Sequence, residues 1–165
     1  AGFFAECFNE RKCLCNRLSY QCYIPVIDVG VGMQRDHDNV IGGAARATLI
    51  GPELPCLFCQ EIVRPEMISA EHLSPEEYES RRGEGYVPTR DHHVPSVISY
   101  TSFASSLGMM VFLDYISENG VDSYSSLLFD LQTKRTMKLR SNIKEECVCK
   151  KRLGKGLSIP FSVVD

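Results

Sequence analysis

Four cysteines in two closely spaced pairs are the residues with the clearest capacity for chemistry. Cys56 and Cys59 form a C-x-x-C directly behind a turn rich in glycine and proline, and Cys147 and Cys149 form a C-x-C near the C-terminus. Zinc takes four tetrahedral thiolate ligands, and each short-spaced pair supplies two of them from one turn. The spacing therefore predicts a structural zinc site that fixes the C-terminal segment to the middle of the chain.

Two other uses of these thiols stay open. Free cysteine packs as a small hydrophobe, so the four side chains could be buried thiols without a metal. Disulfides are a third interpretation, although pairing across so short a spacing is strained. Because the chain opens without a secretory signal, we expect reduced thiols and a cytoplasmic protein. The remaining cysteines crowd a predicted helix, where core packing explains them better than catalysis; they are Cys7, Cys13, Cys15 and Cys22.

Composition excludes several classes of partner. The 165 residues are 44% hydrophobic and 24% charged, which is typical of one soluble globular domain. The formal net charge of −3 lacks the basic footprint of a nucleic-acid binder. A membrane helix needs an apolar run of about 18 residues, and the chain has none. We therefore expect one domain over residues 1–165 that binds neither nucleic acid nor membrane, and a solvated surface for the basic residues at 150–155.

Local patterns predict an α/β fold with a mixed sheet. Helix-forming composition and end signals predict helices over residues 10–23, 74–83 and 97–116. Alternating or β-branched runs predict strands over residues 26–32 and 44–50 and a hairpin of 127–130 with 136–139. The run over 26–32 closes on glycines, which favours a buried strand of a parallel sheet. Small residues in the helix over 97–116 indicate a close approach to that sheet.

Asp28, Gly30 and Gly32 are the candidates for binding a cofactor. Ligands of parallel sheets bind beyond the carboxyl ends of the strands, where these residues are expected to lie. The two glycines match a phosphate loop only weakly, because the third glycine is missing. A helix cap or a buried hydrogen bond remains an equally good role for Asp28.

Two polar clusters offer further candidate ligands. His92 and His93 follow Arg90 and Asp91, and a histidine beside a carboxylate can serve as acid, base or metal ligand. Adjacent side chains on an extended chain point apart, so a solvated loop explains this cluster better. Residues 36–38 are similar, with a polar turn favoured over a second metal site.

Three stretches together resemble one family. The words NRLSY and IPVIDVGVG over residues 16–32, PCLFC over 55–59, and GYV with PSV over 85–97 resemble the bacterial ThiF/HesA/MoeB adenylyltransferases, which are relatives of ubiquitin-activating enzymes. The resemblance covers roughly residues 5 to 150. It depends on the order of the elements as well as on the words.

The resemblance implies a Rossmann-like ThiF fold and an activity. Such proteins bind ATP with Mg²⁺ and adenylylate the C-terminal glycine of a ubiquitin-like or sulfur-carrier protein, and many are homodimers. The family's zinc ligands map onto Cys56, Cys59, Cys147 and Cys149.

The chain also departs from the family. It has no glycine-rich phosphate loop before residue 28, and the family's aspartate and arginine fall at Cys7 and Lys12. The family's crossover loop corresponds to residues 61–94, which contain no cysteine for a thioester. We therefore expect the C-terminal part of an adenylyltransferase that lacks the nucleotide-binding half. The alternative is a non-catalytic, zinc-stabilised interaction module derived from the same family.

Overall fold

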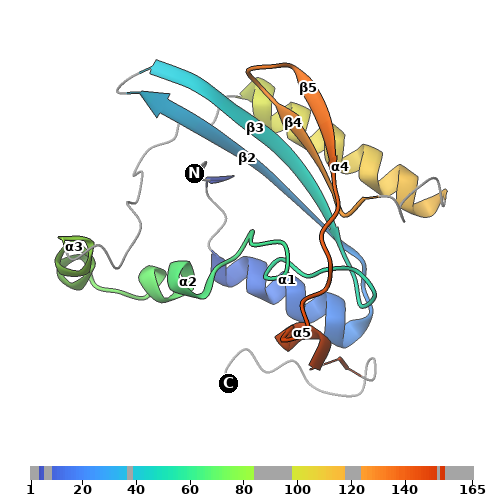
Figure 1. The fold of residues 1–165 in the computed structure, drawn as a ribbon, viewed down its shortest axis with the longest axis horizontal. Coiled ribbons are helices and arrows are strands. Elements are labelled where there is room, and N and C mark those ends of the chain that lie inside the picture. The colour runs from blue at the N-terminus through green and yellow to red at the C-terminus, as the bar shows by residue number, and fades with distance from the viewer. Residues whose placement is uncertain are drawn as a thin grey trace.

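An antiparallel sheet organises the part of the chain that the computed structural model describes, which is residues 4–5, 9–36, 39–83, 98–117, 124–151 and 153–154 (Figure 1). Its strands lie in the order β1-β2-β3-β4-β5, and every neighbouring pair is antiparallel. The strands are β1 (Phe4–Ala5), β2 (Val26–Asp36), β3 (Asn39–Ile50), β4 (Ser126–Asp130) and β5 (Arg135–Leu139). The sheet follows chain order, as a meander of hairpins does.

The prediction of a parallel strand and a mixed sheet is therefore wrong for the described strands. The β-branched run at the start of β2 looks like a parallel strand because β2 is covered on both faces, by α4 (Ile98–Ile116) on one and by α1 (Asn9–Cys22) on the other. The strand also continues past its glycines to Asp36. A bulge between Gln34 and Arg35 shifts its register against β3.

The predicted helices are confirmed as α1, α3 and α4, and the predicted hairpin is confirmed as β4 and β5. Two short helices complete the described elements, α2 (Pro65–Glu71) and α5 (Val148–Lys151). The cap predicted for α3 (Pro75–Gly83) is a capping box. Glu77 accepts from the backbone N–H and hydroxyl of Ser74, and the Glu77 N–H donates to the Ser74 hydroxyl.

Helix α4 packs on β2 and β3 through its small and aliphatic residues. Ala104, Leu107 and Val111 are buried there in the main apolar cluster. A Cβ at Gly108 would lie 2.7 Å from Cγ2 of Val29, so only glycine permits this approach. The close packing predicted from the small residues is confirmed.

The opposite face of the sheet carries polar side chains. The hydroxyls of Thr48 and Ser126 lie 2.8 Å apart across β3 and β4, and Ser126 donates to the side chain of Gln60. Ser19 of α1 donates to the carbonyl of Ile50 at the end of β3. Helix α1 is therefore anchored to this face by hydrogen bonds. None of the helices in the described ranges combines the length and apolarity needed to cross a bilayer.

Candidate metal centre

The segment over residues 51–63, here called the cysteine turn, leaves β3 and folds back on itself. Leu54 N–H donates to the carbonyl of Gly51, and Gln60 N–H donates to that of Cys56. The N–H groups of Ile62 and Val63 both donate to the carbonyl of Leu57. These bonds curl the chain around the C-x-x-C, so that both of its sulfurs lie on one side of the turn.

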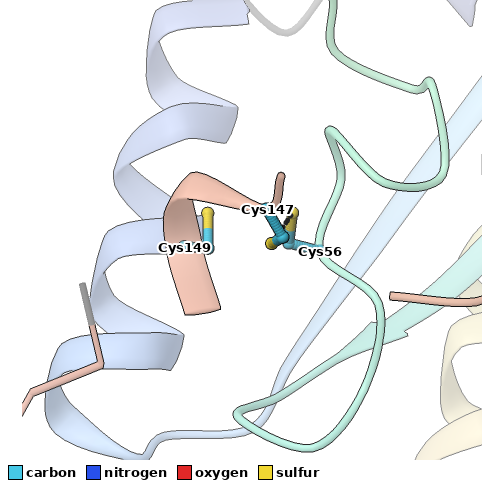
Figure 2. A group of neighbouring side chains, drawn as sticks. All are labelled: Cys56, Cys147 and Cys149. Carbon is cyan, nitrogen blue, oxygen red and sulfur yellow. Dashed lines mark hydrogen bonds between the residues drawn. The ribbon is translucent and has the colours of Figure 1, made fainter. Parts of the chain in front are cut away.

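The second cysteine pair belongs to the C-terminal part of the chain. Beyond β5 the backbone runs to the cysteine turn, and Cys147 accepts a hydrogen bond at its carbonyl from Lys151 in the short helix α5. Glu61 and Lys144 form an ion pair of 2.9 Å between the two segments. Figure 2 shows Cys149 on α5, with Cys147 just before that helix and Cys56 on the cysteine turn opposite.

Two of the sulfur–sulfur distances match the spacing of a tetrahedral zinc site. Cys56 Sγ is 3.6 Å from Cys59 Sγ and 3.7 Å from Cys147 Sγ. Zn–S bonds of 2.3 Å set the edge of the tetrahedron at about 3.8 Å. The sulfurs of Cys56, Cys147 and Cys149 all lie within 4.8 Å of one another, so these three thiols could bind a metal such as zinc. Cys59 is outside that mutual group but adjoins it through Cys56.

Two backbone N–H groups are directed at the sulfurs. Lys144 N–H donates to Cys59 Sγ and Lys150 N–H donates to Cys147 Sγ, each at 3.4 Å. A hydrogen bond to the charged form of a thiol favours that form. Each of these two thiolates would therefore be stabilised in the geometry that the folded chain already provides.

Burial and neighbouring thiols oppose ionisation when no metal is bound. Cys56, Cys59 and Cys147 are buried. A hydrogen bond with Cys149, together with burial, raises the pKa of the Cys56 thiol, and burial raises the pKa of Cys147 to about 11. Without a metal, the thiols of Cys56 and Cys147 are therefore protonated at neutral pH, and a bound cation would be what ionises them.

Residues of α1 support the cluster from behind. Tyr20 is buried against Cys56, Cys59 and Cys147, and its hydroxyl donates to the carbonyl of Leu54. Desolvation raises the pKa of this phenol, which therefore stays a neutral donor. Asn16 is also fully buried, and its Oδ1 accepts a 3.1 Å hydrogen bond from Leu57 N–H.

The sequence interpretation missed these supporting roles. Asn16 and Tyr20 lie four residues apart on one face of α1, and a polar side chain aligned with a buried aromatic on one helix face is the signal that could have found them. The ion pair of Glu61 with Lys144 joins segments 83 residues apart, and no local pattern indicates it.

Asp28, Gly30 and Gly32 do not lie at the end of a parallel strand. Asp28 is near the start of β2, where its carboxylate lies 2.9 Å from Arg46 and 3.7 Å from the ammonium of Lys12. The side chains of Lys12, Asp28 and Arg46 are 8%, 10% and 5% exposed. The glycines are in mid-strand, with Gly30 opposite Arg46 and Gly32 opposite Ala44. Asp28 therefore accepts a hydrogen bond from Arg46 within the fold, one of the roles that the sequence left open.

The structure describes some of the remaining cysteines and basic residues that the sequence singled out. Cys13 and Cys15 contact the apolar cluster around Ile50 and Leu57, in agreement with core packing. Lys150 and Lys151 are exposed, and Lys151 pairs with Glu146. The side chains of Cys7, residues 36–38, residues 90–93, Arg152 and Lys155 lie outside the described part of the chain.

Comparisons of this chain with protein-family models, with curated proteins and with solved structures find no match. The candidate metal centre is therefore assigned from its own geometry.

Proposed function

We propose that Cys56, Cys59, Cys147 and Cys149 bind one structural zinc ion that joins the C-terminal segment to the cysteine turn and to α1. The observation that carries this proposal is the spacing of the sulfurs, 3.6 Å and 3.7 Å around Cys56, which matches the edge of a zinc–thiolate tetrahedron. Both distances are far longer than the S–S bond of a disulfide, which is about 2.05 Å.

A structural role fits this donor set better than a catalytic one. Catalytic zinc keeps an open position for water or substrate, whereas four thiolates fill the coordination sphere. The cluster is also enclosed by Tyr20, Phe58 and Ile143. The ion would therefore stabilise the junction between the C-terminal segment and the cysteine turn.

Hydrogen exchange tests this junction directly. With zinc bound, the amides of Lys144 and Lys150, which donate to sulfur, should exchange slowly. Chelation should accelerate both, because thiols that regain their protons are weaker acceptors than thiolates. Ser125 N–H, which donates to Leu139 in the sheet, serves as the internal reference and should not change. If chelation left the exchange rate of each of the three amides unchanged, the proposal would be contradicted.

We further propose that the chain acts as the zinc-bearing, carrier-binding part of a ThiF-like adenylyltransferase. The support is the order of the sequence words together with their placement: NRLSY is on α1 and PCLFC is in the cysteine turn, and Asn16 and Tyr20 hydrogen-bond to that turn. The partner would be a ubiquitin-like or sulfur-carrier protein whose C-terminus is activated with MgATP. The contribution of this part would be placement of the carrier, which can supply much of a rate enhancement.

The second candidate is a non-catalytic interaction module with the same zinc site, and a specific observation favours it. Asp28 is engaged by Arg46 and Lys12, and Gly30 and Gly32 lie in mid-strand instead of at a helix N-terminus. Within the described ranges these residues do not form a phosphate loop.

ATP–pyrophosphate exchange separates the two candidates. The zinc-loaded chain is mixed with ATP, Mg²⁺ and a carrier protein that ends in Gly-Gly. Exchange that depends on the carrier supports adenylylation. Carrier binding without exchange, measured by calorimetry, supports the interaction module. Neither exchange nor carrier binding would contradict both, while leaving the zinc proposal to its own test.

A further inference from the structure

The outer face of α4 exposes a group of large apolar side chains. Met109, Met110, Phe112, Leu113 and Ile116 are between 44% and 58% exposed. These five residues are called here the α4 apolar face. Figure 1 shows α4 beside the sheet and away from α1, α2 and α5, so those helices do not cover this face.

The exposure is not a consequence of poor packing of α4. The helix is already attached to the sheet through a separate stripe, Ala104, Leu107, Gly108 and Val111, all of which are buried. A helix of a globular protein normally carries polar residues opposite its buried stripe. Here both faces of the C-terminal half of α4 are apolar.

Charge is nearly absent from α4. Asp114 is the one charged residue between Ile98 and Ile116. Its carboxylate accepts a 2.6 Å hydrogen bond from the hydroxyl of Tyr124, so it is directed to the inner side of the helix. The α4 apolar face therefore has no charge with which to attract or select a partner of opposite sign, and a surface depleted of charge is typical of a homodimer interface.

The spacing on this face has two-fold symmetry. Met109, Phe112, Leu113 and Ile116 are at positions i, i+3, i+4 and i+7, which lie on one side of a helix. This pattern is the same when read in either direction about the point between Phe112 and Leu113. When two copies of α4 pack antiparallel about that point, Met109 of one copy meets Ile116 of the other. Phe112 of one copy then meets Leu113 of the other, so both residues lie next to the two-fold axis.

We propose that the α4 apolar face is a two-fold interface at which this chain binds a second copy of itself. The four side chains of this pattern each expose about half of roughly 200 Å² and together offer about 400 Å² of apolar area per copy. A standard interface buries about 800 Å² per partner, so these residues supply about half of it. An isologous contact uses the same patch twice, which suits a symmetric pattern on one helix. The proposal does not depend on zinc or on a carrier protein.

Sedimentation velocity of the full chain over a wide concentration range tests the proposal. We expect a dimer for the unmodified chain. Leu113→Glu should weaken self-association by roughly a hundredfold or more, because it opposes two desolvated like charges at the symmetry axis. Leu113 is half-exposed in the single chain. The variant should therefore fold, which circular dichroism checks.

Ser102→Glu is the matched control. Ser102 is exposed on the same side of α4 but two turns before Met109, outside the antiparallel overlap. This variant should remain a dimer. A monomeric unmodified chain would overturn the proposal. So would a Leu113→Glu variant that still dimerises, or equal weakening by both substitutions.

A pair of charge substitutions tests the antiparallel register. Met109→Lys and Ile116→Glu should each weaken the dimer when introduced alone. The double variant should self-associate at least tenfold more tightly than either single variant, since each introduced lysine then faces an introduced glutamate of the second copy. If the double variant is as weak as the singles, the proposed two-fold arrangement is wrong.

Discussion

The side-chain oxygen of Asn16 accepts a 3.1 Å hydrogen bond from the backbone N–H of Leu57, the residue that follows Cys56 in the C-x-x-C. This bond joins the middle of α1 to the cysteine turn across 41 positions of sequence. Both groups are buried. Asn16 therefore holds the backbone of the cysteine turn next to the first cysteine pair. Its Nδ2 has no hydrogen-bond partner among the described residues.

Asn16→Leu should lower the free energy of unfolding by about 1–3 kcal/mol, because it leaves the Leu57 N–H buried without an acceptor. It should also weaken zinc binding, since the cysteine turn is no longer preorganised. Urea denaturation measures the first effect and competition with a chromophoric chelator the second. Asn142→Leu, at an exposed asparagine, is the control and should change neither quantity. Unchanged zinc affinity in Asn16→Leu would exclude the positioning role.

The buried ion cluster of Asp28, Arg46 and Lys12 gives a second prediction. Asp28→Leu should destabilise the fold by about 3–5 kcal/mol, because it leaves two buried cations without their carboxylate. Burial already lowers the pKa of Arg46, and Asp28 opposes that shift. The double variant Asp28→Leu with Arg46→Met should recover part of the loss, which urea denaturation can measure. A loss below about 1 kcal/mol in the single variant would show that the cluster is solvated.

The capping box of α3 predicts a pH dependence. Hydrogen bonds from the backbone N–H and hydroxyl of Ser74 lower the pKa of Glu77. A depressed carboxyl pKa stabilises the fold above the ordinary pKa of glutamate, and the stabilisation is lost as the pH falls through the folded-state value. Glu77→Gln should therefore be less stable than the unmodified chain at neutral pH, and the difference should shrink in acid. Glu76→Gln, at its exposed neighbour, should show no such trend in thermal melts across pH.

Zinc binding should release protons. Burial raises the pKa of Cys147 to about 11, and the pKa of Cys56 is raised as well, so these thiols are protonated at neutral pH before the metal binds. If four thiols become thiolates, about four protons leave for each zinc. Calorimetry in two buffers with different ionisation enthalpies measures this number. Release of about two protons or fewer would contradict a site of four cysteines.

Local signals in the sequence predicted the three longest described helices, α1, α3 and α4, but not α2 or α5. Ser74 with Glu77 is a cap that acts within one turn, and the small residues of α4 indicate close packing wherever the sheet lies. The direction of β2 could not be predicted in this way. A β-branched run that is covered on both faces has the same composition in a parallel or an antiparallel sheet. Its pairing with β3 is set by the hairpin and its register.

The sequence predicted that the two cysteine pairs would lie together, but not the residues that support them. Short spacing indicates that two cysteines can share a metal, so both pairs could be named from the sequence. The partners of Asn16, Tyr20 and Asp28 depend on how α1 lies over the sheet. Gly30 lies directly opposite Arg46 in the register, and Asp28 is two residues from Gly30 on the same face. Asp28 and Arg46 are therefore diagonal neighbours across β2 and β3, which allows them to pair.

The zinc content per chain tests the central claim most directly. Elemental analysis would be made on the unmodified protein, on Cys56→Ser and on Cys22→Ser, all purified without chelator and supplied with zinc. Cys22 is half-buried and outside the cluster, so it is the matched control. We expect about one zinc in the unmodified chain and in Cys22→Ser, and none retained by Cys56→Ser. An unmodified chain without zinc, or a Cys56→Ser variant that retains a full equivalent, would contradict the proposed site.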